Sequence, residues 1–118
     1  MTTYLTNAFS LGMLGEGAFK DLNGKEYSTI IVHRASVEEV KRFMSYRGFI
    51  SAVGHKSTAD FLSELLGVNV EYNRIQIELK RGDVVIVFQL QQRLPEGALL
   101  EDLAGMKYQF FIVTVTYL

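Results

Sequence analysis

The chain has 118 residues, of which 48% are hydrophobic and none is cysteine, and its formal net charge at pH 7 is −1. This size predicts one domain spanning residues 1–118, and the lack of cysteine excludes disulfides, thiolate metal sites and a cysteine nucleophile. With near-neutral charge, two histidines, no signal segment and no apolar run approaching ~20 residues, we expect a cytoplasmic protein that binds no duplex DNA, membrane, metal or cofactor.

The first third of the chain is predicted to form two strands separated by turns. Residues 4–9 have the pattern of a short strand, and Ser10 is placed to cap a brief helical segment that ends at Leu14. Several glycines and an Asn-Gly pair predict turns within the stretch 15–24. Residues 28–34 are rich in β-branched side chains and therefore predict the second strand.

The middle of the chain is predicted to form two helices. Ser36 and Glu39 have the spacing of a capping box, which predicts a helix over residues 37–46. A second helix is predicted to begin at Ser57 or Thr58 and to end before a glycine. The apolar faces are expected to be Val37, Val40, Phe43 and Met44 in the first helix, and Phe61, Leu62, Leu65 and Leu66 in the second.

The last third is predicted to be mostly strand. Residues 75–80 alternate between apolar and polar side chains, as in a strand with one wet face, and residues 80–83 form a turn. Residues 84–90 form an apolar run suited to a central strand, a short helix is expected over 99–104, and residues 109–117 form a closing strand. Because helices and strands do not alternate regularly, we expect an α+β fold with a mixed sheet flanked by helices.

The segment Gly54-His55-Lys56-Ser57-Thr58 is the first candidate for chemistry. It places a histidine, which can protonate a leaving group near neutral pH, beside a predicted helix start. The first backbone N–H groups of a helix are unpaired and favour phosphate. These residue types predict proton transfer at a phosphodiester, and the alternative is a histidine that serves the fold alone.

The second candidate is the segment from Gln89 to Gly97, at the end of the predicted central strand. Arg93 presents a rigid fork of donors that suits phosphate oxygens and stabilises charge that develops at phosphorus. Glu96 could orient a histidine, hold the arginine or accept from a ribose hydroxyl. The alternative for both residues is a surface ion pair beside a turn.

Three further polar residues are weaker candidates. Asn7 and Ser10 lie where the first strand meets its helical segment, a junction suited to phosphate or base edges, although an ordinary turn would explain them as well. Arg74 could contact phosphate or lie free on the surface. His33, the other histidine, lies within a predicted strand and is interpreted as structural.

Four separated motifs occur together in one order: Asn7-Ala8-Phe9-Ser10 with Met13-Leu14, Gly54-His55-Lys56-Ser57-Thr58, Asn73-Arg74, and Gln89 to Gly97. With these motifs the chain resembles the viral ring nucleases, type III anti-CRISPR proteins that degrade cyclic tetra-adenylate. The resemblance implies a small α+β protein that encloses the cyclic ligand in a pocket at a homodimer interface. It also implies metal-free cleavage into linear di-adenylate with a 2′,3′-cyclic phosphate.

Carried over by position, the resemblance makes His55 the general acid and Arg93 and Glu96 the other catalytic residues. The expected ligand contacts are Asn7, Ser10, Ser57, Thr58, Arg74 and Gln89. Attack by the ribose 2′-OH on its own phosphate needs no external nucleophile, which agrees with the residues present. One alternative is a protein that binds or sequesters a cyclic oligonucleotide without cleaving it. Another is a DNA-binding or structural phage protein.

Overall fold

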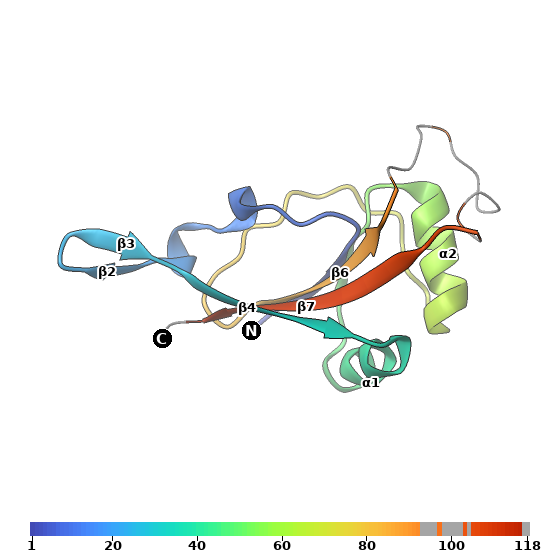
Figure 1. Cartoon of the computed structure of the whole chain (residues 1–118), viewed down its shortest axis with the longest axis horizontal. Coiled ribbons are helices and arrows are strands. Elements are labelled where there is room, and N and C mark those ends of the chain that lie inside the picture. Colours follow the sequence, from blue (N-terminus) through green and yellow to red (C-terminus); the bar gives the residue numbers. More distant parts are fainter. Residues whose placement is uncertain (93–96, 98–102, 104, 117–118) are drawn as a thin grey trace.

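The structure, a computed structural model of the whole chain, describes residues 1–92, 97, 103 and 105–116. Its centre is a five-stranded sheet with the strand order β4-β7-β6-β1-β5 (Figure 1). The strands are β1 (Thr3–Thr6), β4 (Thr29–Ala35), β5 (Ile50–Ala52), β6 (Val84–Leu90) and β7 (Tyr108–Thr116). The predicted mixed sheet of a single α+β domain is therefore confirmed.

The sheet has a parallel half and an antiparallel half. β1 pairs in parallel with both β5 and β6, so that Leu5 lies opposite Ser51 on one side and opposite Ile86 on the other. β7 runs antiparallel to β6 and to β4. The carboxyl ends of β5, β1 and β6 consequently meet at one edge of the sheet, and this edge positions the candidate site.

Helices α1 (Val37–Arg47) and α2 (Lys56–Leu66) cover one face of the sheet. α1 begins with the predicted capping box, because the Ser36 side chain accepts from the Glu39 N–H and the Glu39 carboxylate accepts from the Ser36 N–H, both at 3.1 Å. These hydrogen bonds, the one from the Ser36 backbone first, lower the pKa of Glu39. The core on this face includes Leu5, Val40, Met44, Leu62, Leu66, Ile86, Phe88, Phe110 and Ile112.

The opposite face is covered by the 3₁₀ helices η1 (Leu11–Met13) and η2 (Glu16–Ala18) and by Ile77 and Leu79 of the segment 71–80, which starts beside β5 with Tyr72 opposite Val53. The predicted strand over 75–80 was wrong. Ile77 and Leu79 are buried as the alternation predicts, but the backbone of Leu79 bonds to a loop, donating to the Met13 carbonyl at 2.6 Å and accepting from Gly15 N–H at 2.9 Å. Alternation thus identified two buried side chains, but the third member of the pattern, Ile75, is 42% exposed, and the backbone pairing was not predicted.

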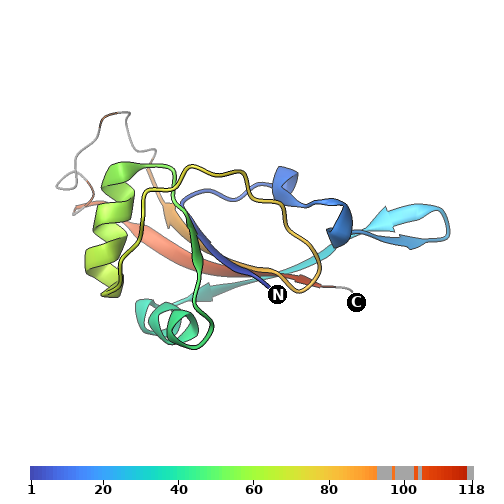
Figure 2. The ribbon, with the colours of Figure 1, turned by 180° about the vertical axis from the view of Figure 1, so that it is seen from behind.

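A hairpin of β2 (Lys20–Leu22) and β3 (Lys25–Tyr27) projects from the far end of the sheet (Figures 1 and 2). Its turn is the predicted Asn-Gly pair, with both residues at positive φ. The predicted strands over 84–90 and 109–117 are confirmed as β6 and β7. The predicted helix over 99–104 lies almost entirely outside the described residues. Within the described part of the chain, no helix has the length and apolar character needed to cross a membrane.

Candidate functional site

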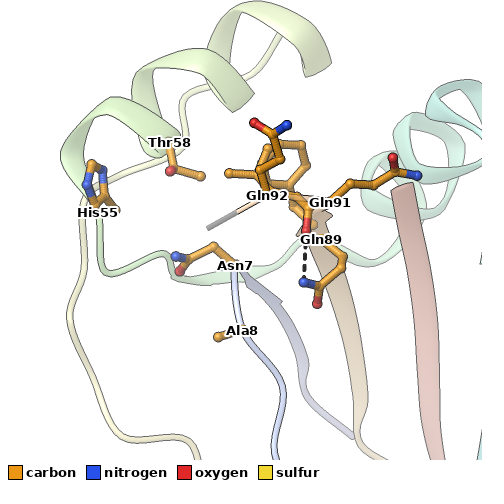
Figure 3. A pocket seen from close by; sticks show the side chains of 9 residues that line it. Asn7, Ala8, His55, Thr58, Gln89, Gln91 and Gln92 are labelled. Carbon is orange, nitrogen blue, oxygen red and sulfur yellow. Dashed lines mark hydrogen bonds between the residues drawn. The ribbon is translucent and has the colours of Figure 1, made fainter. Parts of the chain in front are cut away.

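A pocket of about 540 Å³ opens at the edge where the three parallel strands end (Figure 3). Binding crevices commonly lie outside the carboxyl ends of parallel strands. The pocket is lined by Asn7 and Ala8 after β1, by His55 and Thr58 at the start of α2, and by Phe88, Gln89, Leu90, Gln91 and Gln92 at the end of β6. Three of the four sequence motifs therefore contribute residues to one pocket.

His55 is the N-cap residue of α2, with an extended backbone, so the helix begins at Lys56 and not at Ser57 or Thr58 as predicted. Histidine is not among the residues that usually cap helices, which explains the error. The His55 side chain is half-buried and makes no capping hydrogen bond. Its buried Nδ1 atom has no hydrogen-bond partner among the described residues. The imidazole is thus placed by the backbone that carries it.

Ser57 and Thr58 lie in the first turn of α2 and do not cap it. Thr58 is 1% exposed, lines the pocket, and its Oγ1 atom has no partner among the described residues. The first N–H groups of a helix also lack partners within it, so donors converge here. Lys56 forms an ion pair with Asp60 at 2.7 Å along the exposed side of the helix.

Asn7 connects the end of β1 to the residue before His55. Its Oδ1 atom accepts a hydrogen bond from the backbone N–H of Gly54 at 3.1 Å. Asn7 also lines the pocket, where Figure 3 shows it beside the start of α2. Asn7, which was predicted to contact the ligand, therefore also supports the backbone that leads to His55.

Arg74 does not line the pocket but lies next to it. A side chain built on Gly54 would come within 3.4 Å of the Arg74 Cγ atom, so the arginine stem lies against the backbone that leads to His55. Asn73 holds this segment, since its N–H donates to the Val53 carbonyl at 2.9 Å and its Nδ2 donates to the Ser51 carbonyl at 2.7 Å. Ser51 Oγ in turn donates to the Glu71 carbonyl at 2.6 Å.

The glutamines at the end of β6 form the opposite wall of the pocket. Gln89 Nε2 donates to the Leu90 carbonyl at 3.1 Å. In Figure 3 the side chain of Gln92 extends toward α2, whereas that of Gln91 points away from it. Sequence reasoning gave Gln92 no role of its own, and the run of amides was the signal that could have identified it.

Two further described residues that were predicted to contact the ligand, Ser10 and Ser57, do not line this pocket. Ser10 precedes η1 as predicted, but it is exposed, makes no side-chain capping bond and does not line the pocket. Arg93 and Glu96 lie outside the described residues. His33 is exposed on β4.

The charge of the pocket favours an anionic group. Among its described lining residues, His55 is the one titratable side chain and none is a carboxylate. The hydroxyl of Thr58, the amides of Asn7 and the glutamines, and the first N–H groups of α2 supply hydrogen-bond donors. Within the described ranges, no group of three or more His, Asp or Glu side chains could hold a metal ion. The arrangement can bind phosphate oxygens and deliver a proton to one of them.

The sequence and the structure both match known proteins. The family model described as STIV B116-like matches residues 3–110. The chain is 39% identical over 98 residues to uncharacterized protein 26 of Sulfolobus islandicus filamentous virus. This alignment covers 80% of this chain and 82% of that protein. It is 40% identical over 85 residues to the uncharacterized protein YddF of Bacillus subtilis, covering 69% of this chain and 79% of that protein.

Among solved structures, B116 of Sulfolobus turreted icosahedral virus matches this chain with a TM-score of 0.73 and 28% sequence identity. The match covers 97% of this chain and 99% of B116. The fold described above is thus shared over nearly its whole length with a viral protein.

Proposed function

This chain belongs to the STIV B116-like family, and we propose that it is a metal-independent ring nuclease that cleaves cyclic tetra-adenylate. One observation carries the proposal. His55 lies at the start of α2, inside a pocket whose described lining is rich in hydrogen-bond donors and lacks carboxylates. These are the groups that an enzyme needs to bind a phosphodiester and protonate its leaving oxygen.

The proposed reaction uses the ligand's own nucleophile. A ribose 2′-OH attacks the adjacent phosphorus and releases its proton to water, while the bond from phosphorus to the 5′-oxygen breaks. His55 donates a proton to that oxygen and is reprotonated from water before the next cut. The product end is a 2′,3′-cyclic phosphate, and two such cuts convert the ring into two linear di-adenylates. Asn7, Thr58 and the first N–H groups of α2 hold the phosphate. By resemblance, Arg93 stabilises the charge at phosphorus and Glu96 completes the catalytic group.

The size of the pocket supports action as a homodimer. A volume of about 540 Å³ is typical of a site for one small molecule. Cyclic tetra-adenylate has four nucleotides, so one pocket holds part of the ring and a second protomer would cover the rest. A two-fold axis would also bring one His55 to each of two opposite phosphates. We therefore place the ligand at a homodimer interface.

The consequence of cleavage is the loss of a second messenger that activates type III CRISPR effectors. Ser10, Ser57, Arg74 and Gln89 complete the proposed ligand contacts, by resemblance. Relatives of this chain occur in a virus and in a bacterium. A viral copy would act as an anti-CRISPR protein, and a cellular copy would switch the response off.

The test is incubation of the purified protein with radiolabelled cyclic tetra-adenylate in EDTA, followed by separation of the products. We expect linear di-adenylate with a 2′,3′-cyclic phosphate. His55→Ala should slow cleavage by roughly 10²–10⁴-fold, the usual contribution of a general acid, while binding is largely kept. His33→Ala is the matched control, because it removes the other histidine, which is exposed outside the pocket.

Two results would contradict the proposal. Intact ligand at stoichiometric protein would exclude the enzyme, and a tight gel shift in the same sample would favour the alternative of a protein that sequesters a cyclic oligonucleotide. Undiminished cleavage by His55→Ala would instead exclude the proposed role of the histidine.

A further inference from the structure

We propose that Asn7 is a positioning residue for His55 and that it presents the hydrogen-bond donors of its NH₂ group to the ligand. The Asn7 side chain is bound by its oxygen to the N–H of Gly54, 47 positions further along the chain. Gly54 directly precedes His55, so this bond joins the end of β1 to the backbone that carries the imidazole. The part of the inference that concerns the ligand rests on the proposed function.

His55 depends on its backbone because its side chain is not held by hydrogen bonds within the described residues. It forms no capping bond, and its Nδ1 atom has no partner there. The orientation of the imidazole therefore follows from the path of residues 53–55. A backbone N–H that loses its partner in a partly buried place is costly, so the bond to Asn7 restricts that path.

Three contacts hold the same backbone, one from the side of β1 and two from the opposite side. Asn7 reaches Gly54 from β1, which lies on the inner side of β5 in the sheet. On the outer side, Asn73 N–H donates to the Val53 carbonyl at 2.9 Å, and the stem of Arg74 lies against Gly54. The backbone before His55 is therefore held between β1 and residues 73–74. Of the residues that hold it, Asn7 also lines the pocket.

The bond to Gly54 also fixes which end of the amide faces the ligand. An N–H can donate only to the oxygen of an asparagine side chain, so the Asn7 oxygen is turned toward Gly54 and the NH₂ group, with two donors, is left for the pocket. No described lining residue is a carboxylate that could take these donors. The group they fit is an acceptor with negative charge, and a phosphate oxygen beside His55 meets that description.

The positioning role can be tested without ligand on three variants, with amide hydrogen exchange followed by NMR. Asn7→Ala should speed exchange at Gly54 by about tenfold, the size expected when one hydrogen bond is lost. Asn7→Asp keeps an acceptor for Gly54 and should leave its exchange slow. Asn69→Asp is the control, since Asn69 is exposed outside the pocket and the change in charge is the same.

The imidazole signals give a second readout that general loosening of the fold would not reproduce. The protein has two histidines, so His33 serves as an internal reference in the same spectrum. Asn7→Ala should move the His55 signal and leave that of His33 in place. Unchanged Gly54 exchange or an unmoved His55 signal in Asn7→Ala would overturn the positioning role.

The donor role is tested with cyclic tetra-adenylate. Asn7→Asp should weaken binding by at least roughly tenfold, because a carboxylate would then face the phosphate, whereas Asn69→Asp should bind as the wild type does. Binding by Asn7→Asp equal to that of the wild type would overturn the donor role. If the wild type neither binds nor cleaves the ring, the proposed function fails together with the donor role, while the measurements on Gly54 and His55 decide the positioning role separately.

Discussion

The two faces of the sheet are covered in different ways. On one face, α1 and α2 satisfy most of their backbone groups within each helix, apart from those at the helix ends, so this cover is held in place mainly by side-chain packing. On the other face, two short 3₁₀ helices and the segment 71–80 depend on hydrogen bonds to distant parts of the chain, such as those of Leu79 and Asn73. The comparison shows that one cover is built locally and the other is assembled over long range.

The candidate site draws on both covers. His55 and Thr58 come from the start of α2, on the helical side. The segment that places Arg74 against Gly54 belongs to the other cover. We therefore expect defects in the helical cover to lower the free energy of unfolding more, and defects beside Arg74 in the irregular cover to act on the surroundings of His55 as well.

The largest expected effect distinguishes the core under the helical cover from the core under the irregular cover. Leu62 in α2 and Leu79 in the segment 71–80 are both fully buried, which makes them a matched pair. Leu62→Ala should lower the free energy of unfolding by about 3–5 kcal/mol, whereas Leu79→Ala should cost about 2–3 kcal/mol because an irregular segment can collapse into the cavity. Chemical denaturation measures both values, and equal losses would contradict the proposed difference between the covers.

A smaller effect is expected at the bond that anchors the irregular cover beside the site. Asn73→Ala removes the donor to the Ser51 carbonyl and should lower the free energy of unfolding by about 1–2 kcal/mol. Hydrogen exchange should rise around residues 71–75 while α1 stays protected. The control is Asn69→Ala, at an exposed asparagine, and the same exchange pattern in both variants would refute the anchoring role.

A substitution in the capping box of α1 introduces a local defect in the helical cover. Ser36→Ala removes the acceptor for the Glu39 N–H and should cost about 1 kcal/mol in unfolding free energy. Because α1 contributes no residue to the pocket, binding of cyclic tetra-adenylate should not change. A binding defect in this variant would show that the helical cover and the site are coupled more widely than the contacts indicate.

The smallest expected effect is a pH dependence of that cap. The folded state lowers the pKa of Glu39, so the unfolded chain takes up its proton at a higher pH than the folded one does. The stabilisation is therefore complete above the ordinary glutamate pKa and is lost as pH falls through the lowered value. An NMR titration of the Glu39 side chain should give a pKa in Ser36→Ala that returns only part of the way to normal, because the backbone N–H at position 36 still donates to the carboxylate. An unchanged pKa in this variant would argue against the Ser36 hydroxyl as one of the causes.

The same contrast explains how much the sequence could predict. The capping box at Ser36 and the apolar run that becomes β6 are local signals, and both predictions were confirmed. Residues 75–80 were misassigned, because alternation cannot distinguish a sheet strand from a segment that covers a sheet face. The hairpin of β2 and β3 was seen only as a turn, since its strands are exposed on all residues and carry no hydrophobic pattern.

The site could be predicted in part for a related reason. Asn7, His55, Thr58 and Gln89 were selected by residue type and resemblance, and the structure brings them together in one pocket. The bond from Asn7 to Gly54 could not be foreseen, because it depends on β1 pairing with β5. The hydrogen bond from Ser51 to the Glu71 carbonyl likewise joins residues 20 positions apart, so no local pattern could indicate it.

The place of β1 in the sheet has a consequence for the order of events during synthesis. β1 leaves the ribosome well before its neighbours in the sheet, because β5 and β6 end only at residues 52 and 90. Such distant partners are typical of slow folding. Asn7, His55 and Gln89 therefore cannot meet until most of the chain has been translated, so a nascent or prematurely terminated product has no pocket with which to capture a nucleotide.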